Sequence, residues 1–316
     1  PRSWNALPPH LYFILAGFSN QPEVEALLFG LISIFYFLTL VGNSTIILES
    51  CFDPCLHTPI NFFLSNLSFL ELGFITSCVP QMLVNLIRSD RVISHLGCVV
   101  QLYIFLWLGA TKCVLLVVMA FDRYVAICRP LNYLTIMHPR LCFLLAAIAW
   151  GAGGLGNSVI QSTITLRLPR CGHRHLAHFI CEVPALIKLA CMDTKANEIQ
   201  LFVATLVLLL LPMTLIMLSY GFIARAVLRI KSSQAWQKAL GTCGSHLLVV
   251  TLFFGMGSVI YIQPNSSFSK TSGKFLTLFY TVVTPTLNPI IYTLRNKDML
   301  GAVRRLLWKD CCSMKT

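Results

Sequence analysis

Of the 316 residues in this chain, 56% are hydrophobic and only 11% are charged, and the mean hydropathy is +0.73. A soluble domain carries about 25% charged residues, so this composition excludes a globular protein whose whole surface faces water. The net charge of +12 lies mostly between apolar stretches, and no stretch combines the charge density and exposed aromatic residues of a nucleic-acid site. We expect a membrane-embedded protein with no nucleic-acid partner.

Seven stretches are long and apolar enough to cross a bilayer as helices, which takes about 20 residues each. In chain order they are Leu27–Leu48, Thr58–Leu86, Gly97–Phe121, Leu141–Leu166, Ile199–Ala224, Ala239–Ile262 and Phe275–Leu294. The expected fold is therefore an all-α membrane protein, a seven-transmembrane helix bundle that forms a single domain over residues 1–316.

Charge predicts the orientation of the bundle. If residues 1–26 are extracellular, the cytoplasmic segments hold more Lys and Arg than the outer ones, once the long loop 163–196 is set aside. This distribution follows the positive-inside rule. Residues 1–25 are polar and lack the apolar run of a cleavable signal peptide, so we expect the first span to direct the chain to the membrane.

Polar residues within membrane spans are costly and usually functional. Asn43, Glu71 and Lys112 are such residues, and Asn288-Pro289 interrupts the last span. Glu71 and Lys112 each lie about halfway along their spans, and a buried Glu–Lys pair would neutralise both charges. A static structural pair and a conformational switch are both compatible with this spacing, and we favour the static pair.

The inner ends of the third and seventh spans carry two further patterns. In Asp122-Arg123-Tyr124 the acid can hold the neighbouring Arg by charge-assisted hydrogen bonds, although an Arg at the interface is often only a snorkelling side chain. After the last span, apolar residues at helical spacing predict a short amphipathic eighth helix within residues 295–316. Cys311 and Cys312 follow it, as free thiols or as palmitoylation sites.

The outer side holds four cysteines, namely Cys98 and, in the long loop, Cys171, Cys181 and Cys191. In an oxidising compartment they predict two disulfides, with three pairings open. The same loop contains His173, His175 and His178, for which solvated histidines are a better interpretation than a metal site. Asn265-Ser-Ser in the last outer loop is a glycosylation sequon.

Several motifs together resemble the olfactory receptors of tetrapods, within the rhodopsin-like (class A) G-protein-coupled receptors. The resemblance covers nearly the whole chain and rests on these stretches: Gly42-Asn43, Leu56-His57-Thr58-Pro59, residues 62–68 (FFLSNLS), residues 119–128 (MAFDRYVAIC), Ser219-Tyr220, residues 238–247 (KALGTCGSHL) and residues 285–292 (PTLNPIIY).

The resemblance implies a receptor rather than an enzyme, with no cofactor. It implies that a small volatile odorant binds in the outer half of the bundle, and that a stimulatory olfactory-type G protein is activated and raises cyclic AMP. It also implies a plasma-membrane location, in olfactory cilia, and the disulfides Cys98–Cys181 and Cys171–Cys191. The residues implied in G-protein activation are Asp122, Arg123, Tyr124, Tyr220, His246, Asn288, Pro289 and Tyr292.

The resemblance also implies a largely apolar ligand pocket. Its residues would be Phe105, Leu106, Gly109, Ala110, Cys113, Glu182, Val183, Thr205, Leu208, Phe254, Gly257, Ser258, Tyr261, Leu278 and Thr281. Such a lining suits a ligand bound by burial and one or two hydrogen bonds. Ordinary helix packing is the competing interpretation of each of these residues taken alone.

Some positions depart from the family pattern. Lys112 stands where family members usually carry an acid, and that acid, with the one matching Glu71, can hold a sodium ion. We therefore hypothesise a Glu71–Lys112 ion pair in place of sodium. Asn61 and Phe121 replace aromatic residues usual in the family, and the usual amino-terminal glycosylation sequon is absent, since Asn5-Ala-Leu does not qualify.

Other classes of membrane protein fit less well. A transporter would need several deep charges along a water path, whereas only Glu71 and Lys112 lie deep. An intramembrane protease or hydrolase motif is absent, and Cys243 with His246 lacks an orienting third group. A light receptor would need a lysine midway along the last span, which reads Tyr280-Thr281-Val282-Val283. A receptor for a non-odorant ligand outside the nose remains the alternative function.

Overall fold

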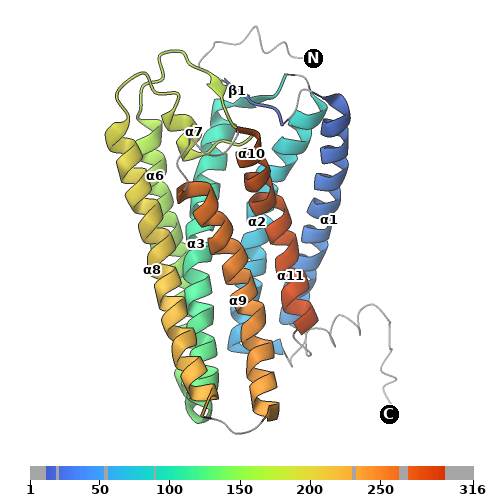
Figure 1. Cartoon of the computed structure of the whole chain (residues 1–316), viewed down its shortest axis with the longest axis vertical. Coiled ribbons are helices and arrows are strands. Elements are labelled where there is room, and N and C mark those ends of the chain that lie inside the picture. Colours follow the sequence, from blue (N-terminus) through green and yellow to red (C-terminus); the bar gives the residue numbers. More distant parts are fainter. Residues whose placement is uncertain are drawn as a thin grey trace.

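The computed structural model describes residues 12–18, 21–52, 56–88, 90–229, 233–262 and 270–295. In these ranges the chain forms a bundle of long helices, seen side by side in Figure 1, with a small β-sheet at one end. Six helical stretches are each long and apolar enough to cross a membrane, and Cys243–Val259 forms a shorter apolar helix. The seven-helix bundle is thus confirmed.

The first three spans are single helices, α1 (Pro22–Phe52), α2 (Pro59–Ile87) and α3 (His95–Cys128). Their starts follow local sequence signals. Pro59 occupies the first turn of α2, where its missing N–H has no helical partner to lose. The Ser94 side chain accepts a hydrogen bond from the Gly97 backbone N–H at 3.0 Å and so caps α3.

The short segments η4 (Pro130–Asn132) and α4 (Tyr133–Ile136) connect α3 to the fourth span. That span is continuous but irregular, with α5 (Pro139–Ile148), the π-helix η5 (Ala149–Gly156) and α6 (Asn157–Leu166) in succession. Gly153 and Gly154 let η5 approach α3 closely. A Cβ atom on Gly154 would lie 2.0 Å from Thr111 Oγ1. The spacing of apolar residues did not predict this wider π-helical turn.

The last three spans are α8 (Lys195–Val227), α9 (Ser233–Ile262) and a composite of α10 (Lys270–Leu278), the π-helix η6 (Phe279–Val283) and α11 (Thr284–Arg295). The first and last spans pack together, since the Thr39 and Thr286 hydroxyls lie 2.6 Å apart. A Cβ on Gly42 would lie 3.0 Å from Pro289 Cγ, so the glycine admits the proline ring.

The bundle is helical as expected, and a small three-stranded sheet that the sequence did not predict lies at one end of it. Strand β1 (Tyr12–Leu15) lies between β2 (Val92–Ser94), to which it is antiparallel, and β3 (His175–Leu176), to which it is parallel. Residues 12–15, which precede the first span, are therefore part of this sheet. The sheet shares a hydrophobic core with the short helix α7 (Val183–Ile187), through Phe13, Ile93 and Leu186.

Some predicted features lie outside the described residues. These are the amphipathic eighth helix of residues 295–316, the cysteines Cys311 and Cys312, and the sequon at Asn265. Tyr261 belongs to α9, but its side chain is also outside the described part.

Candidate functional site

Two disulfides hold the long loop over the sheet end of the bundle. Cys98 at the start of α3 is bonded to Cys181, and Cys171 is bonded to Cys191, with Cα–Cα distances of 5.4 and 5.9 Å. This is the pairing that the family resemblance implies. Gln101 of α3 fixes the loop further, because its Oε1 accepts the Cys181 backbone N–H at 2.9 Å. The loop therefore forms a lid with a defined position.

Under this lid lies a cavity of about 110 Å³ between α3, α6, α8, α9 and the lid itself. Ten of the predicted pocket residues line it: Phe105, Leu106, Gly109, Ala110, Cys113, Glu182, Val183, Thr205, Leu208 and Gly257. The walls are largely apolar, and Glu182 is the only charged residue among the lining residues that the structure describes. The cavity is therefore suited to a small, mostly apolar molecule.

Four predicted pocket residues, Phe254, Ser258, Leu278 and Thr281, do not line this cavity. Phe253 and Tyr280 line it from the sixth and seventh spans instead. One residue along a helix turns the side chain by about 100°, so an error of one position moves a residue from the cavity wall into the packing. Phe254 is fully buried, and its ring meets that of Phe253 edge-on at 5.1 Å between centroids.

The cavity also has lining residues that the sequence analysis missed. They are Asn157, Pro184, Leu201, Leu209, Phe253 and Tyr280. Asn157 carries a recognisable signal, since it is a polar residue inside the fourth span. The others are apolar or aromatic residues in apolar helices, and only the rotation of each helix selects them.

Lys112 and Glu71 meet in the middle of the bundle. Lys112 Nζ lies 2.6 Å from Glu71 Oε1, and both side chains are buried. Asn288 Nδ2 of α11 donates to the same carboxylate oxygen at 2.5 Å. The ammonium also lies over the Phe253 ring, 4.6 Å from its centroid, which is within cation–π range. The cluster joins α2, α3, α9 and α11.

Phe253 therefore links this cluster to the cavity under the lid, because its side chain lines that cavity and the Lys112 ammonium lies over its ring. A ligand that moved Phe253 would change the surroundings of a buried ammonium. Burial makes this change energetically important, since an ion in a low-dielectric interior depends strongly on its few partners.

At the opposite end of α3, Arg123 forms an ion pair with the preceding residue, Asp122. Arg123 Nε donates to Asp122 Oδ2 at 3.0 Å, and Asp122 itself is fully buried. The Tyr133 hydroxyl of α4 donates to the other carboxylate oxygen at 2.7 Å. Burial, together with the charge of Asp122, raises the pKa of Tyr133, so this tyrosine stays a hydrogen-bond donor. The sequence analysis did not identify Tyr133.

The other residues expected at the inner end lie in the same half of the bundle. The Tyr220 hydroxyl and His246 Nδ1 are 2.8 Å apart and link α8 to α9. Tyr124 packs edge-on against Phe222 of α8 at 6.0 Å between ring centroids. Tyr292 is buried, and its hydroxyl has no hydrogen-bond partner within the described part of the chain.

The loop histidines do not converge. His173 Nδ1 lies 3.4 Å from the Leu189 carbonyl, whereas His178 Nε2 lies 3.7 Å from Glu182. Across the residues that the structure describes, no three His, Cys, Asp or Glu side chains are placed to hold a metal ion.

A bundle of seven apolar helices, with a lidded cavity at one end and an Arg paired with a buried Asp at the other, defines a seven-helix membrane receptor. A model of the olfactory receptor family matches residues 32–310. The chain is 59% identical to human olfactory receptor 2G3 over 295 residues, which covers 93% of this chain and 95% of that protein.

Two further relatives agree. Human olfactory receptor 2W1 is 54% identical over 295 residues, covering 93% of this chain and 92% of the relative, and mouse olfactory receptor 2C1 is 59% identical over 297 residues, covering 94% and 95%. The chain belongs to the olfactory receptor family. It is an odorant-sensing G-protein-coupled receptor of the plasma membrane and not an enzyme.

Proposed function

We propose that the receptor binds a small odorant in the cavity under the lid and activates a stimulatory, olfactory-type G protein, which raises cyclic AMP. The observation that carries the proposal is the apolar cavity under the lid, whose lining comes from α3, α6, α8, α9, η6 and the disulfide-bonded loop. We place the disulfide side outside the cell, because disulfides persist in oxidising compartments, and the cavity's position supports ligand entry from that side.

The lining indicates the ligand's chemistry. Each methylene group that a ligand buries against the apolar walls contributes about 0.8 kcal/mol to binding. A small odorant has few such groups and therefore binds weakly. Glu182 accepts hydrogen bonds, and Asn157 and Thr205 offer both donors and acceptors. A small odorant with an apolar body and one hydrogen-bond donor, such as an alcohol, fits this lining.

The proposed signalling path runs from the cavity through Phe253 and the Lys112–Glu71–Asn288 cluster to the Asp122–Arg123 pair. Arg123 would face the G protein when the inner end of α9 moves outward, with Tyr220, His246 and Tyr292 supporting the open state. The proposed orientation puts residues 1–26 outside and the carboxyl terminus in the cytoplasm, and the proposed site of action is the olfactory cilium.

An odorant panel with cyclic AMP as the readout tests this proposal. Gly257→Leu adds bulk to the buried cavity wall and should shift the response of an active odorant to higher concentration. Gly255→Leu, two residues away on an exposed face of α9, is the matched control and should leave the response unchanged. A panel without cyclic AMP responses at normal surface levels, or equal effects of the two variants, would contradict the proposal.

A further inference from the structure

Glu182 gives the cavity under the lid a charge that its other walls lack. It is the only charged residue among those described as lining this cavity, and it is 9% exposed. A carboxylate in such a place has lost most of its water. Burial of a charge is costly unless an opposite charge or several hydrogen bonds compensate for it, so the charge of Glu182 needs a partner.

The helix that follows Glu182 does not supply this partner. Glu182 occupies the N-cap position of α7, where an acidic side chain commonly accepts a backbone N–H, yet its side chain makes no such hydrogen bond. Within the described part of the chain, its only ion-pair contact is with His178, whose Nε2 lies 3.7 Å from Glu182 Oε1. The carboxylate is therefore left facing the cavity.

His178 does not neutralise this carboxylate. A separation of 3.7 Å is longer than a hydrogen bond. Burial also lowers the pKa of His178 below its ordinary value, so the imidazole is uncharged at neutral pH. The His178 ring stacks on Phe179 at 4.4 Å between centroids, which holds it in this position.

The buried lysine of the bundle does not neutralise the cavity either. Lys112 is not among the lining residues, and its ammonium lies 2.6 Å from Glu71. Phe253 lines the cavity, and Lys112 lies over its ring. The cavity therefore presents one carboxylate and, among its described lining residues, no cation.

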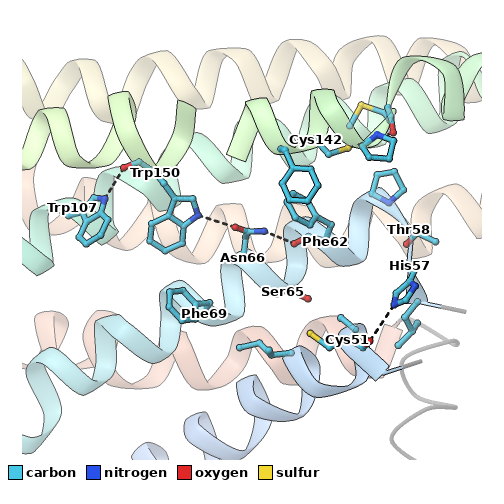
Figure 2. A pocket seen from close by; sticks show the side chains of 17 residues that line it. Cys51, His57, Thr58, Phe62, Ser65, Asn66, Phe69, Trp107, Cys142 and Trp150 are labelled. Atoms are coloured by element: carbon cyan, nitrogen blue, oxygen red, sulfur yellow. Dashed lines mark hydrogen bonds between the residues drawn. The ribbon is translucent and has the colours of Figure 1, made fainter. Parts of the chain in front are cut away.

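A second cavity shows that this charge is particular to the cavity under the lid. It has a volume of about 720 Å³ and lies between α1, α2 and the fourth span, and its described lining residues include no Lys, Arg, Asp or Glu. Figure 2 shows that side chains of its wall bond to one another. Trp150 Nε1 donates to Asn66 Oδ1 at 3.0 Å, and Asn66 Nδ2 donates to the Phe62 carbonyl at 2.9 Å. That cavity gives no reason to expect a charged ligand.

We propose that the cavity under the lid binds a protonated primary amine, with its ammonium group paired with Glu182 and its alkyl chain against the apolar walls. An ammonium group has three hydrogen-bond donors and no acceptor, which suits a carboxylate without donors. Asn157 and Thr205 line the same cavity and carry further acceptor oxygens. The assignment rests on the proposed odorant site and narrows its ligand from any hydrogen-bond donor to a cation.

The volume of the cavity limits the size of the amine. Each water-sized group takes up about 10–15 Å³, so a cavity of about 110 Å³ holds roughly seven to eleven non-hydrogen atoms. Hexylamine lies within this range and is protonated at neutral pH. The alcohol 1-hexanol has the same length and no charge, so the two compounds differ chiefly in the property that Glu182 would recognise.

Dose–response curves for hexylamine and 1-hexanol, with cyclic AMP as the readout, test the assignment. The wild type should respond to hexylamine at a concentration about tenfold lower, as expected for a close charge pair. Glu182→Gln keeps the side-chain shape, removes the charge and should abolish this preference. Glu198→Gln removes an exposed acid of α8 that does not line the cavity, and this matched control should keep it. Equal potency in the wild type, or an unchanged preference in Glu182→Gln, would overturn the assignment.

A binding measurement without the G protein separates this assignment from the proposed signalling function. A ligand that binds the folded receptor raises its thermal midpoint. Purified full-length receptor in phosphatidylcholine nanodiscs should show a larger rise with hexylamine than with 1-hexanol at equal concentration. If this difference is found without any cyclic AMP response, the amine site stands and the signalling proposal fails. If the wild type shows no difference, the amine assignment fails even where other odorants raise cyclic AMP.

Discussion

Lys112 forms a buried ion pair in the middle of the bundle. Its ammonium lies 2.6 Å from Glu71 and over the Phe253 ring, where the family resemblance would place an acidic residue and a sodium ion. We infer that the Lys112 ammonium, a tethered cation, takes the place of a mobile sodium ion. The sequence suggested this pair from depth alone, but it could not show that Asn288 shares the same carboxylate oxygen.

Reversing one charge of this pair should prevent normal folding. Lys112→Glu places two carboxylates together in the interior, and a buried charge without its partner costs roughly 3–5 kcal/mol. We expect a large loss of receptor at the cell surface, measured by flow cytometry. The double variant Glu71→Lys/Lys112→Glu restores an ion pair and should recover much of that level.

Sodium provides the complementary measurement. Replacing external and internal sodium by a large organic cation should leave the wild-type odorant response unchanged, because Lys112 already occupies the site. A sodium-dependent shift in the response would contradict the tethered-cation interpretation.

His178 should make the lid sensitive to acid. Burial lowers the pKa of His178 below its ordinary value, Glu182 partly opposes this shift, and Lys274 and Lys188 add to it. A depressed pKa means that the folded lid favours neutral His178. The stability that neutral His178 gives to the folded lid is therefore present above the ordinary His pKa of about 6.5. This stability is lost as pH falls below that value.

The odorant response should accordingly weaken when the external medium is acidified from about pH 7.5 to 5.5. His178→Gln, which cannot be protonated, should respond with a smaller change. His175→Gln, at an exposed position of the same loop, should behave like the wild type. A steeper pH dependence in His178→Gln than in the wild type would disprove the explanation.

At the scale of elements, the sequence predicted the number and order of the spans but not their irregularities. Apolar length identifies each span because the bilayer demands it. The π-helices η5 and η6 depend on contacts with neighbouring helices, and the small sheet joins three short segments that are far apart in sequence. Neither feature has a periodicity that a single sequence reveals.

Gly154 tests the close approach of η5 to α3. A Cβ at this position would lie 2.0 Å from Thr111 Oγ1 and 2.8 Å from the Trp107 carbonyl oxygen, so Gly154→Ala should force the two helices apart. Overpacking of this kind typically costs about 1–3 kcal/mol, and we expect a lower surface level and a lower thermal midpoint.

Gly151→Ala is the matched control, since a Cβ at Gly151 in the same π-helix meets nothing within 4 Å. Gly151→Ala should leave the surface level and the thermal midpoint near the wild-type values. If Gly151→Ala and Gly154→Ala reduced them equally, the effect would come from helix propensity, and the close approach would not matter.

At the scale of the whole molecule, the bundle connects two chemically different ends. The lidded apolar cavity reaches from the lid, which is bonded to the start of α3, to the middle of that helix, and the Asp122–Arg123 pair lies near its other end. The sequence predicted which residues belong to each end, because motifs place them along the chain. It could not select Phe253 over Phe254 at the cavity, because that choice depends on the rotation of α9 within the packed bundle.

Arg123→Ala, compared with the wild type for both odorant binding and cyclic AMP, tests the central claim most directly. If the outer cavity signals through the inner Arg123, this variant should bind an active odorant with near-normal affinity but should lose the cyclic AMP response. A full cyclic AMP response in Arg123→Ala at normal surface level would contradict the claim.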